Sequence, residues 1–399
     1  MKLNEPYLII DLNDESLIFF IITCDETNEL KIIKKKIIES RGIQNGKIID
    51  YNRTSQLIKE IINQIEDEID FYFSKVSIVI NPTDIKCLNV SGFKKLNGSQ
   101  VLNEDIAFIL NDIKNIVTFN ENKSSVIHLF NSSFNLDSDN LENLPIGLFG
   151  EFYNQNMTFI LSENNVLKNF KLALEESNIS INKIILKPFA EAVHLISRHK
   201  YKDNFFTFEL KKNQIQVSLF RNKSFIFFEN FNFGLNLIIK DISKLCSLKE
   251  EEVEILLNNL NLKEHLSFDD ESVVEKNYFS ISPYRKVKHK LVLDIIVARI
   301  DELLDICCKK NLNLSFIGKD INNIYFKINS ESCYKNIQFA LENIKNTSVF
   351  NYSHNYPDQA YSGVSGAAEL IMNGWEKEAV PVTQEKKSII SRFFSSLFT

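Results

Sequence analysis

The residue types that most often perform catalysis are present in this chain of 399 residues, but their spacing builds no reactive site. The six histidines stand singly, without the i, i+4 pairing or the Cys/His clustering of a metal site. The six cysteines show no CxxC spacing, and the adjacent Cys307 and Cys308 would point to different sides of a helix, so we expect reduced, structural thiols. Residues 362–368 lack the GxSxG order of a nucleophilic serine and follow no clear strand, which favours close helix packing through small side chains. We therefore predict no catalytic residue and no metal site.

Residues 386–399 carry chemistry of another kind, because their apolar side chains recur at helical spacing. The apolar face consists of Ile389, Ile390, Phe393, Phe394, Leu397 and Phe398. Serines and Arg392 occupy the opposite face, and Arg392 with two preceding lysines supplies positive charge for anionic lipid headgroups. We predict an amphipathic helix that lies in the membrane interface without spanning the bilayer. The alternative is a helix docked on its own domain or on a partner, and the polar segment that precedes it argues against that alternative.

Charge is distributed unevenly along the chain. The formal net charge of -6 argues against a general nucleic-acid binder, because neutralising phosphates needs a basic excess, so we expect no nucleic-acid partner. A local basic cluster nevertheless comprises Arg285, Lys286, Lys288, Lys290 and Arg299. An acidic peptide would suit this cluster, and an ordinary solvated helix face is the alternative interpretation.

The elements that must position these residues form two similar patterns. Residues 7–11, 17–23 and 29–39 predict strands, 54–70 predicts a helix and 76–80 a further strand. Three strands at 205–231 and a helix near 237–245 repeat the beginning of this order, while 167–177, 183–186 and 189–197 predict a helix, a strand and a helix between the halves. Two mixed sheets covered by helices are therefore predicted. Residues 81–155 and 236–311 interrupt the halves as insertions, the latter with helices at 249–258 and 290–309.

Neither a secretion signal nor a membrane span is expected from the sequence. Acidic residues follow the first apolar run at once, and no uninterrupted apolar run reaches the ~18 residues that cross a bilayer. The hydrophobic fraction of 44% and charged fraction of 25% are those of ordinary globular chains. We expect a cytoplasmic protein.

Several runs, in order along the chain, resemble the family of the bacterial division protein FtsA. Residues 40–50 read SRGIQNGKIID and resemble the family segment S-R-G-I-x-x-G-x-I-x-D, and residues 186–192 resemble its L-x-P-x-A-x-A connector. Gly234, Asn236 and Asp241 resemble the G-x-N-x-x-x-x-D-I motif, and the helix around Arg299 resembles I-x-x-R-x-x-E-L. The order of these matches covers nearly the whole chain.

This resemblance implies the α/β, actin/Hsp70-like two-lobed fold with an FtsA-type inserted 1C subdomain. Its boundaries would place subdomain 1A at 1–80 and 159–200, 1C at 81–158, 2A at 201–235 and 312–373, 2B at 236–311, a linker at 374–387 and the membrane helix at 388–399. It also implies self-association into filaments, binding of the FtsZ C-terminal peptide by 2B, and recruitment of downstream divisome proteins. The location would be the cytoplasmic face of the inner membrane at the division septum. The residues assigned to FtsZ binding are Arg299, Lys290, Arg285, Asn236 and Asp241.

The nucleotide motifs of the family are degenerate in this chain. The first phosphate hairpin, D-I-G-[ST]-[ST]-K in the family, reads DLNDES at residues 11–16, so Asp14 and Glu15 would face the phosphates. The second, D-I-G-G-G-T-T-D, reads ELKKNQIQ at 209–216 and has no glycine, and T-G-G-G reads IGKD at 317–320. Lysines cannot replace the close backbone approach that glycine permits.

The degenerate ATP site would therefore lie near Asp11, Asn13, Glu209, Lys211 and Gly318. We expect a pseudo-ATPase that is no enzyme and holds no cofactor, with retained binding of ATP and Mg²⁺ as the alternative. Two other functions stay open, a PilM-like component of a pilus or secretion machine and an actin-fold ATPase. The terminal helix favours the division adaptor over the first, and the missing phosphate loops argue against the second.

Overall fold

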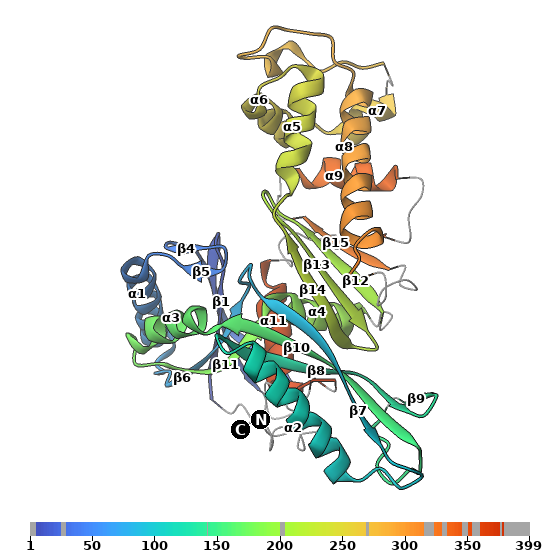
Figure 1. Cartoon of the computed structure of the whole chain (residues 1–399). Coiled ribbons are helices and arrows are strands. Elements are labelled where there is room, and N and C mark those ends of the chain that lie inside the picture. Colours follow the sequence, from blue (N-terminus) through green and yellow to red (C-terminus); the bar gives the residue numbers. More distant parts are fainter. Residues whose placement is uncertain are drawn as a thin grey trace. The chain divides into compact units, whose positions relative to one another are not determined.

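The protein forms two compact units in the computed structural model (Figure 1). The structure describes residues 5–24, 29–141, 143–199, 204–268, 271–314, 323–328, 333–344, 350–352, 360–375 and 377–378. The first unit comprises Met1–Asp203, Phe220–Phe228 and Pro357–Thr399, and the second comprises Asn204–Leu219 and Glu229–Tyr356.

A five-stranded sheet forms the centre of the first unit. Its order is β11 (Ser180–Leu186), β6 (Lys75–Ile80), β1 (Tyr7–Leu12), β2 (Ser16–Cys24) and β3 (Leu30–Glu39). Strand β1 pairs antiparallel with β2 and parallel with β6, and every one of its residues is buried. This explains its nearly continuous apolar sequence, since a central strand covered on both faces has no solvent side.

Helices cover both faces of this sheet. On one face α1 (Tyr51–Ile69) and α3 (Asn164–Glu175) share an apolar core with the strands. Helix α1 begins where the Asp50 side chain accepts a hydrogen bond from the Arg53 N–H, and Ile58, Ile62 and Ile65 recur at helical spacing on its buried face. On the other face α4 (Lys187–His199) and α11 (Ser362–Asn373) pack against each other and against β1 and β6.

A second sheet lies in the segment predicted as an insertion. It has the order β7 (Lys86–Lys95), β10 (Phe152–Glu163), β8 (Ser124–Leu136) and β9 (Asp139–Leu141), with every described pairing antiparallel. Helix α2 (Asn103–Asn120) covers one face and buries apolar residues at helical spacing among Leu129, Tyr153 and Phe159. The sequence patterns considered above do not predict this helix.

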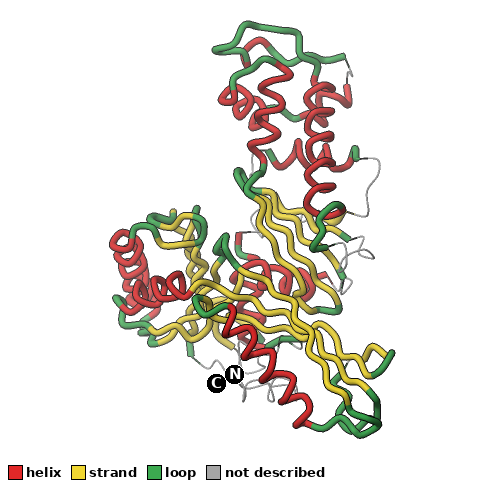
Figure 2. The backbone as a smooth tube through the Cα atoms, viewed as in Figure 1, coloured by secondary structure: helices red, strands yellow, loops and turns green. Residues whose placement is uncertain are grey.

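The second unit combines a sheet with a group of helices (Figures 1 and 2). The sheet order is β14 (Ser224–Phe231), β13 (Ile215–Arg221), β12 (Phe205–Leu210), β15 (Ile324–Ile328) and β16 (Phe350–Tyr352), and the Phe220–Phe228 hairpin tip belongs to the first unit. The helices are α5 (Leu235–Cys246), α6 (Glu250–Asn259), α7 (Leu262–Phe268), α8 (His289–Leu304) and α9 (Tyr334–Glu342), with a 3-10 turn at Lys276–Tyr278 and a π-helical turn at Asp305–Lys309. Figure 1 shows α5 to α8 gathered beyond one end of this sheet.

The strands and helices predicted from apolar periodicity are confirmed, with shifts of a few residues at their ends. The strands at 7–39 and 205–231 and the helices at 54–70 and 249–258 all form. The small-residue run at 362–368 does begin a helix, α11, and a Cβ on Gly366 would lie 1.7 Å from the Ala190 carbonyl oxygen of α4. Close packing of two helices therefore explains this run, as predicted.

Candidate functional site

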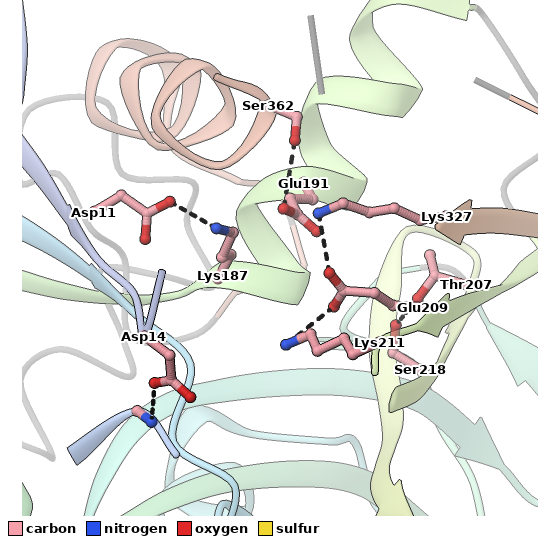
Figure 3. A network of polar contacts seen from close by, with 11 residues as sticks. Asp11, Asp14, Lys187, Glu191, Thr207, Glu209, Lys211, Ser218, Lys327 and Ser362 are labelled. Atoms are coloured by element: carbon pink, nitrogen blue, oxygen red, sulfur yellow. Dashed lines mark hydrogen bonds and ion pairs between the residues drawn. The ribbon is translucent and has the colours of Figure 1, made fainter. Parts of the chain in front are cut away.

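The first candidate residue of the nucleotide site, Asp11, carries a buried carboxylate at the end of β1. Its side chain is fully buried, and the Lys187 ammonium at the start of α4 lies 2.8 Å from its Oδ2 (Figure 3). Neither carboxylate oxygen has a hydrogen-bond partner among the described residues, because this ammonium lies at ion-pair distance but outside hydrogen-bonding geometry. The compensation of the Asp11 charge within this part of the chain therefore depends on Lys187.

The turn that follows β1 bonds to a neighbouring hairpin of the same unit. The Asp14 carboxylate accepts hydrogen bonds from the backbone N–H groups of Asn45 and Gly46, at 2.8 and 2.7 Å. Asn45 and Gly46 both have positive φ, as the tight turn between β4 (Ile43–Gln44) and β5 (Lys47–Ile48) requires. The expectation that Asp14 faces phosphates is therefore wrong, since its carboxylate fastens the neighbouring hairpin. Asn13 closes its own turn with an N–H to Ser16 carbonyl bond of 3.2 Å.

The second candidate carboxylate, Glu209, lies at the end of β12 in the second unit. It is buried, and two ammonium groups flank it, Lys327 at 3.2 Å and Lys211 at 3.5 Å (Figure 3). Behind it, the hydroxyls of Thr207 and Ser218 bond to each other across the sheet.

The loop after β12 is closed by its own backbone bonds. The Lys211 N–H donates to the Gln214 carbonyl at 2.9 Å, and the carbonyls of Lys211 and Lys212 accept the N–H groups of Leu235 and Asn236, the first two donors of α5. The N-terminus of α5 is thereby satisfied by the hairpin. A Cβ on Gly234 would lie 2.3 Å from the Lys211 carbonyl oxygen, which explains why this position is a glycine. Gly318 lies outside the described residues.

These residues do not fit a magnesium nucleotide. Each carboxylate that could face a divalent cation, Asp11 or Glu209, already has a lysine ammonium within 3.5 Å. A second cation beside that ammonium would be repelled in a desolvated setting. The described loops also offer no glycine-lined backbone cradle, and their turn atoms bond to Asn45, Gly46, Leu235 and Asn236.

The predicted partner-binding residues lie in the helical part of the second unit, where the structure brings Arg299 and Asp241 into contact. Arg299 of α8 donates from Nε to Asp241 of α5 at 2.5 Å and from Nη1 to Glu302 at 2.6 Å. The hydrogen bond that Arg299 donates to the Asp241 carboxylate raises the pKa of the guanidinium. Arg285 donates to the Ser247 hydroxyl, Lys290 pairs with Asp294, and Asn236 bonds to Asn213. The guanidinium is therefore already paired with two carboxylates of its own unit.

The predicted membrane-binding residues, from Ile389 to Phe398, lie outside the described residues. The chain is still packed at Trp375 and Glu378, beyond residue 374 where a polar linker is predicted to begin. The Trp375 indole N–H donates to the Lys223 carbonyl at 2.7 Å, and the Glu378 side chain is fully buried. In the described part of the chain no helix is long and apolar enough to cross a membrane, and no group of three or more potential metal ligands forms.

Sequence reasoning missed a buried pair that holds this segment. The His128 Nδ1 lies 2.5 Å from Glu378 Oε1, and its Nε2 accepts the Leu186 N–H at 2.9 Å. Phe130 and Glu378 form an isolated antiparallel bridge, supported by an Asn131 N–H to Lys377 carbonyl bond. The partners are 250 residues apart and His128 stands alone in its local sequence, so no spacing signal could have found the pair.

No family model matches the chain. The chain is 22% identical over 280 residues to the cell division protein FtsA of Buchnera aphidicola subsp. Schizaphis graminum, covering 69% of this chain and 66% of that protein. It is 18% identical over 275 residues to FtsA of Escherichia coli K12 (69% and 65%) and 20% identical over 309 residues to FtsA of Bacillus subtilis 168 (77% and 69%).

The chain is a distant homologue of FtsA. Its matches span about two thirds of the length of the first two of these relatives. A solved structure of a PilM-PilN type IV pilus biogenesis complex contains a chain that superposes with a TM-score of 0.58 at 11% identity, over 92% of this chain and 98% of that one. At this identity the likeness concerns the fold alone, which is the actin-like α/β fold predicted from the FtsA resemblance.

Proposed function

We propose that this protein is a cell-division adaptor that anchors an FtsZ ring to the cytoplasmic face of the inner membrane. The observation that carries the proposal is the match to FtsA proteins from three genera over 69–77% of the chain. Recruitment of later divisome proteins and assembly into an actin-like polymer belong to the same proposal.

The C-terminal sequence supports the membrane part of the proposal. Burying one large apolar side chain fully contributes roughly 1.5–3 kcal/mol, but burial at an interface is partial and ordering a helix costs entropy. A single anchor of this kind therefore binds weakly. Several anchors on one polymer bind together, because the first attachment raises the effective concentration of the others. Membrane binding should accordingly depend on assembly.

The α5 and α8 face of the second unit is the proposed contact for the acidic tail of FtsZ. Arg299 with Asp241 forms a fixed polar element there, and Arg285 and Lys290 add positive charge. Because the Arg299 guanidinium is paired already, the tail would have to compete with Asp241 or Glu302 for it. Arg299→Glu tests this contact against a purely structural role, since a structural residue would change the melting temperature without changing the affinity for the FtsZ peptide.

Catalysis is not part of the proposed role. The pairing of Asp11 and Glu209 with lysines supports a pseudo-ATPase that serves as a scaffold.

Vesicle co-sedimentation tests the proposal. The full chain, and a version ending at Gln384, are mixed with vesicles containing anionic phosphatidylglycerol, with and without FtsZ filaments. We expect only the full chain to bring FtsZ into the vesicle pellet.

Two further variants form a matched pair, because each adds one negative charge to the same segment. Phe394→Asp, on the apolar face, should abolish vesicle binding, whereas Ser395→Asp, on the polar face, should retain most of it. Equal recruitment of FtsZ by the full and shortened chains would refute the membrane role. A full chain that pellets with the vesicles while added FtsZ stays in the supernatant would refute the adaptor role.

A further inference from the structure

A buried carboxylate needs hydrogen-bond donors or a positive partner, and Asp11 and Glu209 are both flanked by lysines. In the first unit the Asp11 side chain is fully buried, and the Lys187 side chain is 12% exposed. In the second unit the Glu209 side chain is 8% exposed and lies between Lys327 and Lys211, which are 19% and 26% exposed. Each carboxylate belongs to the next-to-last residue of a strand that continues directly into a hairpin turn.

We propose that Lys187, Lys327 and Lys211 are built-in cations that replace a bound metal ion and nucleotide in holding these two strand ends. The inference does not depend on the role of the protein in the cell. It concerns only how the charges of Asp11 and Glu209 are compensated, and it states that each unit is folded and charge-balanced without a cofactor.

The position of Lys187 is fixed by packing, which makes its charge a permanent partner. It is the first residue of α4, and α4 approaches α11 so closely at Ala190 that only a glycine fits at position 366. A Cβ on Gly363 would lie 3.4 Å from both Asp11 Oδ2 and Lys187 Cγ, so α11 also covers the ion pair. Solvent is thereby kept away from the pair, and its electrostatic attraction is stronger than at an exposed surface.

Removing one partner of such a pair leaves the other charge buried without compensation, which is strongly destabilising. The fully buried Asp11 has no hydrogen-bond partner among the described residues, so its dependence on Lys187 is the clearest. Glu209 has two ammonium neighbours, and loss of one leaves the other. The inference therefore predicts a larger effect from Lys187 than from Lys327.

Thermal unfolding of the full chain tests the inference, with MgCl2 and Mg-ATP as the probes. We expect neither probe to bind the natural chain, so its melting temperature should change by less than about 1 °C in about 5 mM MgCl2 or about 1 mM Mg-ATP. A ligand that binds the folded state and is present at 100 times its Kd would instead raise the melting temperature by several degrees. Lys187→Ala should lower the melting temperature by about 6–20 °C. In this variant MgCl2 should restore part of the loss, and NaCl of equal ionic strength should not.

The double variant Lys187→Ala with Asp11→Asn removes both charges and should recover at least half of the loss and lose the response to MgCl2. Lys171→Ala is the matched control, because Lys171 pairs with Glu175 on the surface, where the two side chains are 65% and 47% exposed. The melting temperature of this control should stay within about 2 °C of that of the natural chain. The melting temperature of Lys327→Ala should lie between those of Lys187→Ala and Lys171→Ala.

Four results would overturn the inference. The first is a rise of the natural chain's melting temperature with Mg-ATP, and the second is a Lys187→Ala protein as stable as Lys171→Ala. The third is a Lys187→Ala protein whose melting temperature does not change with MgCl2. The fourth is a double variant no more stable than Lys187→Ala. A Lys187→Ala chain that fails to fold while the double variant folds supports the inference, because only the charge balance distinguishes them.

Discussion

Breaking the buried pair of His128 and Glu378 should destabilise the first unit and release the chain that follows it. The Leu186 N–H donates to His128 Nε2, so Nδ1 carries the ring proton and donates it to Glu378 Oε1. Both side chains are at most 1% exposed. Glu378→Ala removes the acceptor, leaves the Nδ1–H buried without a partner and opens a cavity.

The magnitude follows from this burial. The Nδ1–H left without an acceptor costs about 1–3 kcal/mol, and the cavity left by the Glu378 side chain adds about 1–2 kcal/mol. For a unit of this size 1 kcal/mol corresponds to about 2–4 °C in melting temperature, so the transition of the first unit should fall by about 4–20 °C. Glu378→Gln keeps the shape of the side chain and an acceptor oxygen, so it should lower the melting temperature much less.

Calorimetry measures the loss, and limited trypsin digestion reports where it occurs. Lys377 is held by the backbone bond to Asn131, so in the natural chain the bond after Lys377 should resist cleavage. Cleavage there should accelerate by at least about tenfold in Glu378→Ala, because the local opening becomes more populated. Mass spectrometry of the products identifies the cut.

A second histidine and glutamate pair provides the control. His194 Nδ1 lies 3.0 Å from Glu369 Oε1, with the glutamate side chain 25% exposed. Glu369→Ala should cost about 1 kcal/mol and leave cleavage after Lys377 unchanged. The reasoning is refuted if Glu378→Ala melts within 2 °C of Glu369→Ala, or if the cut after Lys377 is equally fast in both.

Two further predictions concern pH and helix packing. Burial would raise the pKa of Glu252, but hydrogen bonds, foremost from Ser282, outweigh it and lower the pKa to about 2. Because the folded pKa lies below the unfolded one, the stabilisation is complete above about pH 5 and is lost as the pH falls toward 2. Urea unfolding of the second unit between these pH values should therefore show a decline in the free energy of unfolding that Glu252→Gln removes. Gly366→Ala forces a Cβ to within 1.7 Å of the Ala190 carbonyl oxygen and should cost at least about 3 kcal/mol in calorimetry, whereas Gly363→Ala, whose nearest contact is 3.4 Å, should cost less than about 1.5 kcal/mol.

Local sequence patterns predicted a helix or strand correctly where the spacing of its apolar residues matches the face or faces that it buries in the structure. The buried strand β1 and the amphipathic helix α1 are examples, because each shows in sequence the face or faces that it buries. Helix α2 was missed because exposed Phe108, Ile116 and Phe119 blur its apolar stripe. The family resemblance located Asp11 and Glu209, but it could not show that Lys187 and Lys327 neutralise them, since a partner's position depends on how helices pack.

The mistaken placement of Asp14 has the same origin. Its sequence neighbours place it in the loop after β1, but a short carboxylate bonds to whichever N–H groups the fold brings near, and here those belong to the hairpin turn at Asn45 and Gly46. The SRGIQNGKIID segment that carries the family resemblance is therefore fastened to the loop whose own motif has diverged. This pair of hydrogen bonds fixes the shape of that loop.

The His128 pair also bears on the proposed membrane attachment. Residues 377 and 378 bond to the edge of β8, and Glu378 reaches the ring that accepts the Leu186 N–H at the end of β11. A pull on the chain beyond residue 378 would therefore first load β8 and β11, which are strands of two different sheets of the first unit. Under the adaptor hypothesis this contact ties residues 377 and 378 of the predicted linker to the folded body. Glu378→Ala should free these two residues without changing the apolar face predicted for residues 389–398, so vesicle binding should persist while cleavage after Lys377 becomes fast.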